Sequence, residues 1–233
     1  MAKILGIIPA RGGSKSIPNK NIVDLNGNPL IYYTLIEALK AKNSGFIDEL
    51  IVSTDSTMIK EICERYGVNV PFLRPRNISG DRAKSIDLVL HAIEFYSEKK
   101  IFFDTILLLQ PTSPFRTFKD LKASIKIYES KNADSLISCY SEDYVHPEVM
   151  YENEQGYGNP LSQSHNHGHR KQDVKDVYVR NGAIYISDIN YLQNNQKLIS
   201  DKPALYVMPK ERSVNIDSRF DLELARCLTR RLI

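Results

Sequence analysis

Short apolar runs alternate with longer amphipathic stretches over the first 140 residues of the chain. The runs are rich in β-branched residues and almost continuously apolar, which is typical of strands covered on both faces. These runs are Ile4–Ile8, Leu50–Ser53, Val68–Leu73, Thr105–Leu109 and Ser135–Cys139. The stretches between them place apolar residues at helical spacing. They predict helices over Leu30–Ala41, Met58–Tyr66, Ser85–Tyr96 and Leu121–Glu129.

Strands that alternate with helices predict βαβ units, and therefore an α/β fold with a mostly parallel, doubly wound sheet. Asp55-Ser56 and Asp120 are suitable caps for two of the helices. Strand-like runs return at Val177–Ser187 and Ala204–Met208, and a closing helix is expected from about Arg219 to Arg231.

The alternation stops after Cys139, where the chain becomes polar and loses any sustained period. Residues 141–176 are rich in Asn, His, Gln and Gly. A structureless insertion of this length would be unusual inside a compact domain. We therefore expect one domain over residues 1–233, with an arm inserted at 141–176 that acts as a substrate lid or packs on a partner subunit.

Composition and charge exclude several classes of protein. The formal net charge is only +3, with 42% hydrophobic and 25% charged residues, which does not suggest a nucleic-acid coat or a membrane-surface binder. The cysteines, Cys63, Cys139 and Cys227, are far apart and are expected to be buried apolar residues rather than disulfides or zinc ligands. No signal peptide or membrane span is recognised, so a cytoplasmic location is expected.

Candidate chemistry lies where open parallel sheets bind ligands, outside the carboxyl ends of the strands. The first strand runs directly into Arg11, Gly12 and Gly13, and two lysines, Lys15 and Lys20, follow within ten residues. Glycines allow close backbone approach to phosphate, and these cations would neutralise a polyphosphate. The spacing matches neither a Walker A loop nor a dinucleotide-binding turn. A solvated basic turn is the alternative.

Several blocks in order along the chain resemble the acylneuraminate cytidylyltransferases, the CMP-sialic acid synthetases, a family that includes CMP-legionaminic acid synthetases. The resemblance covers essentially the whole chain. The matching blocks are Ile8–Lys15 with Lys20-Asn21, Ser53–Asp55, Arg74-Pro75, Gln110–Pro114 with Arg116, Asn181–Tyr185 and Ser213–Asp217. The resemblance implies a nucleotide-diphospho-sugar transferase-like fold, and transfer of CMP from CTP to an acidic nonulosonic sugar with release of pyrophosphate.

Residue types and the resemblance together give a candidate site. The catalytic candidates are Arg11, Lys20, Arg170 and Asp217. The candidates for nucleotide or substrate binding are Gly12, Gly13, Ser14, Lys15, Asn21, Arg74, Ser85, Gln110, Lys171 and Asn181. Loop or helix-cap roles are the alternatives for Gln110 and Ser85, and Arg74 could be a surface cation.

The resemblance also implies Mg²⁺ as cofactor, held against the triphosphate by an Asp-x-Asp pair. This chain has Asn215 at the first of these positions, so Asp217 is the main candidate ligand and Asn215 an adjunct. Capping of the following helix is the alternative for Asp217. Arg170, in a polar loop with three histidines expected to be solvated, would pair with the sugar carboxylate or with pyrophosphate.

Three other functions stay open at the level of the sequence. The nearest is a cytidylyltransferase for another acidic sugar, such as pseudaminate or KDO. The second is a sugar transferase that uses a finished nucleotide sugar, and the third is a non-catalytic nucleotide-binding module. The resemblance further implies a homodimer in which the 141–176 arm crosses to the partner.

Overall fold

A mainly parallel sheet forms the centre of the chain. The computed structural model describes residues 2–143, 145–163 and 176–232, and within them six strands form this sheet, in the order β10–β6–β9–β5–β1–β4. The strands are β1 (Ile4–Pro9), β4 (Glu49–Ser53), β5 (Thr105–Leu108), β6 (Ser135–Glu142), β9 (Val177–Asp188) and β10 (Ala204–Val207). β1 pairs in parallel with β4 and β5, and β10 with β6, whereas β9 runs antiparallel between β5 and β6. The predicted α/β fold class is confirmed.

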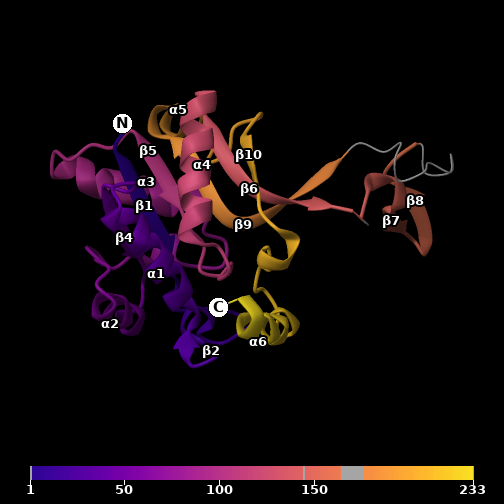
Figure 1. Cartoon of the computed structure of the whole chain (residues 1–233), viewed down its shortest axis with the longest axis horizontal. Helices are drawn as coiled ribbons and strands as arrows, with labels where there is room; N and C mark the ends of the chain where they lie inside the picture. The colour runs from indigo at the N-terminus through magenta and orange to yellow at the C-terminus, as the bar shows by residue number, and fades with distance from the viewer. Residues whose placement is uncertain (1, 144, 164–175, 233) are drawn as a thin grey trace.

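Helices cover both faces of this sheet (Figure 1). They are α1 (Leu30–Asn43), α2 (Thr57–Arg65), α3 (Ser85–Glu98), α4 (Phe118–Lys131) and α5 (Ile189–Asn195), whereas α6 (Arg219–Leu232) packs in a separate cluster with Leu25 and Leu30. Ile4 and Ile8 of β1 belong to the core cluster shared with α1, α2 and α4, while Leu5 and Ile7 belong to the cluster shared with α3 and α5. This alternation follows from the two-residue period of a strand. None of the described helices is long and apolar enough to cross a membrane.

Three local expectations were wrong. Val68–Leu73 forms no strand, and only isolated bridges join Asn69 to Ile51 and Leu73 to Thr54. Pro71 within it has no N–H to donate to a ladder, although Val68 and Val70 are buried as the pattern suggested. Helix α4 begins at Phe118 and is capped by Thr117, with Asp120 completing the capping box. Cys227 is exposed, whereas Cys63 and Cys139 are buried.

The carboxylate of Asp120 is almost fully buried and accepts hydrogen bonds from Arg212 Nη2 at 2.9 Å and Tyr206 Oη at 2.7 Å. Burial alone would raise the pKa of Asp120, but hydrogen bonds from Arg212, Thr117 and Tyr206 outweigh it and hold the pKa below its ordinary value. The folded chain therefore binds this proton less readily than the unfolded chain does.

Stability supplied by Asp120 should consequently be fully present above the unfolded pKa of about 4 and fall away as the pH drops below it. We expect Asp120→Asn to lower the free energy of unfolding by about 3 kcal/mol at pH 7, because it leaves Arg212 without its anion. Urea unfolding from pH 7 to pH 3 checks this, with the exposed Asp201→Asn as control. An Asp120→Asn curve parallel to that of the wild type below pH 4 would contradict the assignment.

The predicted insertion projects from the body of the molecule. β6 and β9 continue outward as a two-stranded ribbon, and a hairpin of β7 (Tyr151–Glu154) and β8 (Tyr157–Pro160) lies at its far end (Figure 1). The polar sequence gave no sign of this hairpin, whose turn uses Gln155 and Gly156 at positive φ. Residues 164–175, including Arg170 and Lys171, lie outside the described residues.

Candidate active site

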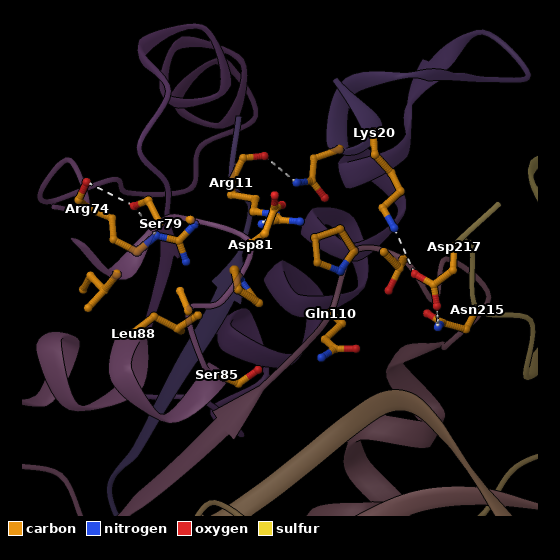
Figure 2. Close-up of a pocket in the computed structure, with 17 residues that line it drawn as sticks. Arg11, Lys20, Arg74, Ser79, Asp81, Ser85, Leu88, Gln110, Asn215 and Asp217 are labelled. Atoms are coloured by element: carbon orange, nitrogen blue, oxygen red, sulfur yellow. Dashed lines mark hydrogen bonds and ion pairs between the residues drawn. The ribbon is translucent and has the colours of Figure 1, made fainter. Parts of the chain in front are cut away.

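A cleft of about 330 Å³ opens at the carboxyl edge of the sheet. It lies beyond Pro9, which ends β1, and Gln110, which follows β5, as expected for an open parallel sheet. Figure 2 places Arg74 on one side and the Lys20–Asp217 pair on the other, with Arg11, Asp81 and Gln110 between them. The lining residues are Pro9, Arg11, Lys20, Asn21, Arg74, Ile78, Ser79, Gly80, Asp81, Ala83, Ser85, Leu88, Gln110, Pro111, Thr112, Asn215 and Asp217.

The glycine loop after β1 contributes Arg11 to the cleft, whereas Gly12, Gly13, Ser14 and Lys15 are not among the lining residues. The Gly12 N–H donates to Asp55 Oδ1 at 2.8 Å rather than pointing freely at a ligand. A Cβ on Gly12 would lie 3.0 Å from the Cβ of Ser56, so close packing against the start of α2 accounts for this glycine. The loop therefore differs from a simple phosphate cradle.

Lys20 lies in the short helix η1 (Lys20–Ile22) and is held at two points. Its Nζ donates to the Ile216 carbonyl at 3.0 Å and to Asp217 Oδ1 at 2.9 Å. The lysine side chain is 15% exposed and the Asp217 side chain 67% exposed. The ammonium group is thus fixed by the protein, and the carboxylate remains accessible.

Asp217 is not the helix cap. Ser218 accepts from the Asp221 N–H, and Asp221 in turn accepts from the backbone N–H groups of Asp217 and Ser218 at the start of α6. The buried Ile216 donates to the Thr112 carbonyl at 2.7 Å, which anchors this segment beside the loop after β5. Ser218 and Asp221 therefore make the capping hydrogen bonds at the start of α6. The carboxylate of Asp217 is left to line the cleft.

Arg74 is buried rather than a surface cation. Its Nε donates to Ser79 Oγ at 3.2 Å, and burial lowers the pKa of the guanidinium, with Asp55 opposing this effect and Arg11 adding to it. Asn21 is also buried, and its amide donates to the Arg11 carbonyl at 2.9 Å. Ser85, the first residue of α3, lines the cleft as well.

An irregularity in β9 lies next to Gln110. The register of β6 against β9 shifts between Ile137 and Cys139, where β9 carries extra residues and forms a bulge. Gly182 in this bulge has φ of +77°, and a Cβ there would lie 3.0 Å from Gln110 Oε1. The bulge thus lets the β9 backbone approach the Gln110 amide closely.

Asn181 is placed behind the cleft rather than in its lining. Its Oδ1 accepts from Ser138 Oγ at 2.6 Å and its Nδ2 donates to Ser213 Oγ at 3.0 Å. The side chain therefore ties the β9 bulge to the segment that leads to Asp217. Its hydrogen bonds are those of a supporting residue, although it was predicted as a substrate contact.

Replacement of Gly182 by alanine should strain the backbone and push on Gln110. We expect a loss of about 1–2 kcal/mol in the free energy of unfolding, because a residue with a Cβ disfavours this left-handed conformation. Urea unfolding measures the loss, with Gly13→Ala, where a Cβ would meet nothing within 4 Å, as the matched control. Equal stability of the two variants would refute the role given to Gly182.

Sequence reasoning missed Asp81 and Arg116 as members of this region. Asp81 lines the cleft, and the fully buried Arg116 donates to the carbonyl of Gln110 at 2.9 Å. Arg116 was noticed within a motif but given no role, and Asp81 carried no signal beyond a polar Gly-Asp turn before a helix. Arg170 and Lys171 lie outside the described residues, among which no group of three or more His, Cys, Asp or Glu could hold a metal.

A cleft with three cations, two carboxylates and three amides, at the carboxyl edge of a doubly wound sheet, defines a protein that handles a nucleotide or another polyanion. The sequence model of the family described as "Cytidylyltransferase" matches residues 5–227. The chain belongs to this cytidylyltransferase family and is a nucleotidyltransferase, which confirms the resemblance stated above.

Similar proteins match nearly the whole of the chain. It is 33% identical to pseudaminic acid cytidylyltransferase of Campylobacter jejuni, with 97% of this chain and 96% of that protein covered. It is also 33% identical to CMP-N,N'-diacetyllegionaminic acid synthase of Legionella pneumophila, with the same coverage, 97% and 96%. N-acylneuraminate cytidylyltransferase of Streptococcus agalactiae is 34% identical over 94% of this chain, which spans 51% of that protein.

The fold is shared with a solved structure titled as a CMP:2-keto-3-deoxy-manno-octonic acid synthetase complexed with CTP. The TM-score is 0.71 with 18% sequence identity, and both chains are covered completely, at 100%. At that identity the likeness concerns the fold alone.

Proposed function

We propose that this enzyme transfers CMP from CTP to the anomeric hydroxyl of an acidic nonulosonic sugar and releases pyrophosphate. The observation that carries the proposal is the meeting of Arg11, Lys20, Arg74 and Asp217 in one cleft. Three cations suit a triphosphate, and a carboxylate among them suits its metal. The substrate class follows from the names of the relatives, which refer to pseudaminic acid, N-acylneuraminate and N,N'-diacetyllegionaminic acid.

The residues of the cleft act by alignment and by neutralisation of charge. The sugar hydroxyl attacks the α-phosphorus of CTP and pyrophosphate leaves, so negative charge moves onto the phosphate oxygens. Lys20, fixed by Ile216 and Asp217, presents its ammonium to these oxygens without reorganisation. The amide of Gln110 offers both a donor and an acceptor to the cytosine edge or to sugar hydroxyls.

Mg²⁺ fits the residues present at one end of the cleft. Asp217 offers an accessible carboxylate, which Lys20 and the amide nitrogen of Asn215 hold in place, and the buried Oδ1 of Asn215 has no hydrogen-bond partner, so both side chains can give an oxygen ligand. Mg²⁺ is commonly held by one or two such groups together with substrate phosphates. When bound, it would supply Lewis-acid stabilisation of the phosphate charge. Asn215 in place of a carboxylate gives the ion one negative charge fewer.

The remaining sequence candidates complete the proposal. Arg170 would orient the sugar carboxylate or the departing pyrophosphate, with Lys171 beside it. Exposed apolar side chains on the arm, such as Val149 and Tyr157, support a homodimer in which a second copy covers the hairpin. Sedimentation of the wild type and of Tyr157→Asp tests this, and a monomeric wild type at micromolar concentration would refute it.

Pyrophosphate release is the direct test of the function. The purified chain would be incubated with CTP, Mg²⁺ and, in turn, N-acetylneuraminate, legionaminate, pseudaminate and KDO. We expect release with one nonulosonic acid, none when ATP or UTP replaces CTP, and none in EDTA until Mg²⁺ is restored. Release of pyrophosphate with KDO alone would show that the sugar substrate is this eight-carbon acid rather than a nonulosonic acid. No release with any sugar, despite CTP binding by calorimetry, would favour a non-catalytic nucleotide-binding module.

A further inference from the structure

The carboxylate of Asp81 forms ion pairs with Arg11 and Lys15, two of the cations that were predicted to bind the triphosphate. Asp81 lies on the loop between the short helix η2 (Arg76–Ile78) and α3, lines the cleft and contacts the glycine loop. Its Oδ1 is 2.9 Å from Arg11 Nη1, and its Oδ2 is 2.8 Å from Lys15 Nζ. One carboxylate therefore bridges Arg11, which lines the cleft (Figure 2), and Lys15, which follows it in the glycine loop.

This arrangement imitates part of the charge pattern of a phosphate. A carboxylate and a phosphate both present anionic oxygens to the fork of an arginine and to an ammonium group. Hydrogen bonding from Lys15, followed by the charges of Lys15 and Arg11, lowers the pKa of Asp81, so the group is anionic at neutral pH. The negative charge of Asp81 would repel a triphosphate that approached the same two cations.

The other carboxylate of the cleft behaves differently. Asp217 pairs with Lys20, which is itself fixed by the Ile216 carbonyl, and its second oxygen accepts from the amide of Asn215, whose buried Oδ1 has no partner. Asp81 has no comparable oxygen neighbour among its described contacts, which are with cations only. The two acids therefore differ in role, one suited to a metal and one to a counter-ion.

The carboxylate of Asp81 can also separate readily from Arg11 and Lys15. Its side chain is 41% exposed and that of Lys15 is 85% exposed, and exposed ion pairs are weak and easily exchanged. Gly80, which precedes Asp81 in this loop, is exposed, and the backbone hydrogen bond from the Ala83 N–H to the Gly80 carbonyl lies within the same loop. Release of the carboxylate needs only a local movement of this loop.

We infer that Asp81 is an internal competitor of the triphosphate: it holds Arg11 and Lys15 in the free enzyme and is displaced when CTP binds. The inference rests on the proposed function, because it assumes that the phosphates of CTP reach these two cations. Asp81 keeps the cations in place before CTP arrives and lowers the affinity of the cleft for any polyphosphate. The same competition favours departure of pyrophosphate after the reaction.

Binding calorimetry in EDTA with Asp81→Asn tests the inference. We expect the variant to bind both CTP and inorganic tripolyphosphate about three- to tenfold more tightly than the wild type, with a difference that shrinks at high salt. A similar gain for pyrophosphate should appear as stronger product inhibition. Asp201→Asn is the matched control, because Asp201 forms an exposed ion pair with Lys197 and its loss changes the net charge equally.

The outcomes separate this inference from its alternatives. Unchanged or weaker binding of tripolyphosphate by Asp81→Asn would overturn it, because removal of a carboxylate that competes for Arg11 and Lys15 must leave both cations freer for the phosphates. Weakening seen only in Mg²⁺ would also overturn it and would make Asp81 a metal ligand. An equal gain in Asp201→Asn would trace the effect to net charge and overturn it as well. A wild type that binds tripolyphosphate but not CTP would refute the proposed function. The ratio of the tripolyphosphate affinities of Asp81→Asn and the wild type would still decide the role of Asp81.

Discussion

Lys20→Ala is expected to lower kcat/KM for pyrophosphate release by about 10²- to 10³-fold, the usual effect of removing one preorganised group that stabilises charge in the transition state. Lys20 is well placed for this role, because Ile216 and Asp217 fix its ammonium group at the edge of the cleft. The loss should fall mainly on kcat, since the charge on the phosphate oxygens grows as pyrophosphate departs.

The same substitution should leave the fold intact. A partly exposed ion pair such as Lys20–Asp217 contributes about 1 kcal/mol or less to stability, so the melting temperature should change little. Lys197→Ala, which removes an exposed lysine of a similar ion pair, is the matched control and should retain full activity. Near-normal turnover by Lys20→Ala would remove Lys20 from the catalytic assignment.

Arg116→Ala is expected to lower the free energy of unfolding by about 4 kcal/mol, the largest loss of stability that we foresee for a single substitution. Arg116 is 1% exposed, and its guanidinium donates to the carbonyls of Ala183 and Gln110 and to the hydroxyl of Thr34. Alanine would leave a cavity and three buried acceptors without their donors.

This arginine also links stability to the site. Burial lowers the pKa of its guanidinium, and the charges of Asp120 and Glu37 partly offset this lowering. Because it holds the backbone of Gln110, the variant should also raise the KM for CTP, measured well below its melting temperature. Urea unfolding gives the stability, with the exposed Arg65→Ala as control. A loss below about 1 kcal/mol would mean that water replaces the guanidinium without penalty.

Much of the fold was predictable because its strands are short, buried runs with a clear period. The sequence did not reveal that β9 runs antiparallel, since an apolar strand looks the same in either direction. Val68–Leu73 met the strand pattern but lacks a ladder, because burial of two valines satisfies the same pattern. The hairpin of the arm was missed because its strands expose both faces and carry no alternation.

The site was predictable where its residues directly follow strands. Arg11 and Gln110 are examples, and both line the cleft as expected. Asp81 and Arg116 were not assigned roles because those roles come from partners distant in sequence, such as Ala183, 67 positions from Arg116. Asn181 is the opposite example. Its place in a motif predicted a substrate contact, but its side chain forms hydrogen bonds with Ser138 and Ser213.

The position of β9 has a consequence for synthesis of the chain. β9 lies between β5 and β6, although it follows both in sequence, and Asp217 is 197 positions beyond Lys20. As the chain leaves the ribosome, β1, β4 and β5 can pair first, but the backbone edge of β5 that pairs with β9 stays open until residue 188 has emerged. Fragments that stop earlier therefore present an unpaired strand edge that favours aggregation, and they lack the Asp217 member of the Lys20–Asp217 ion pair.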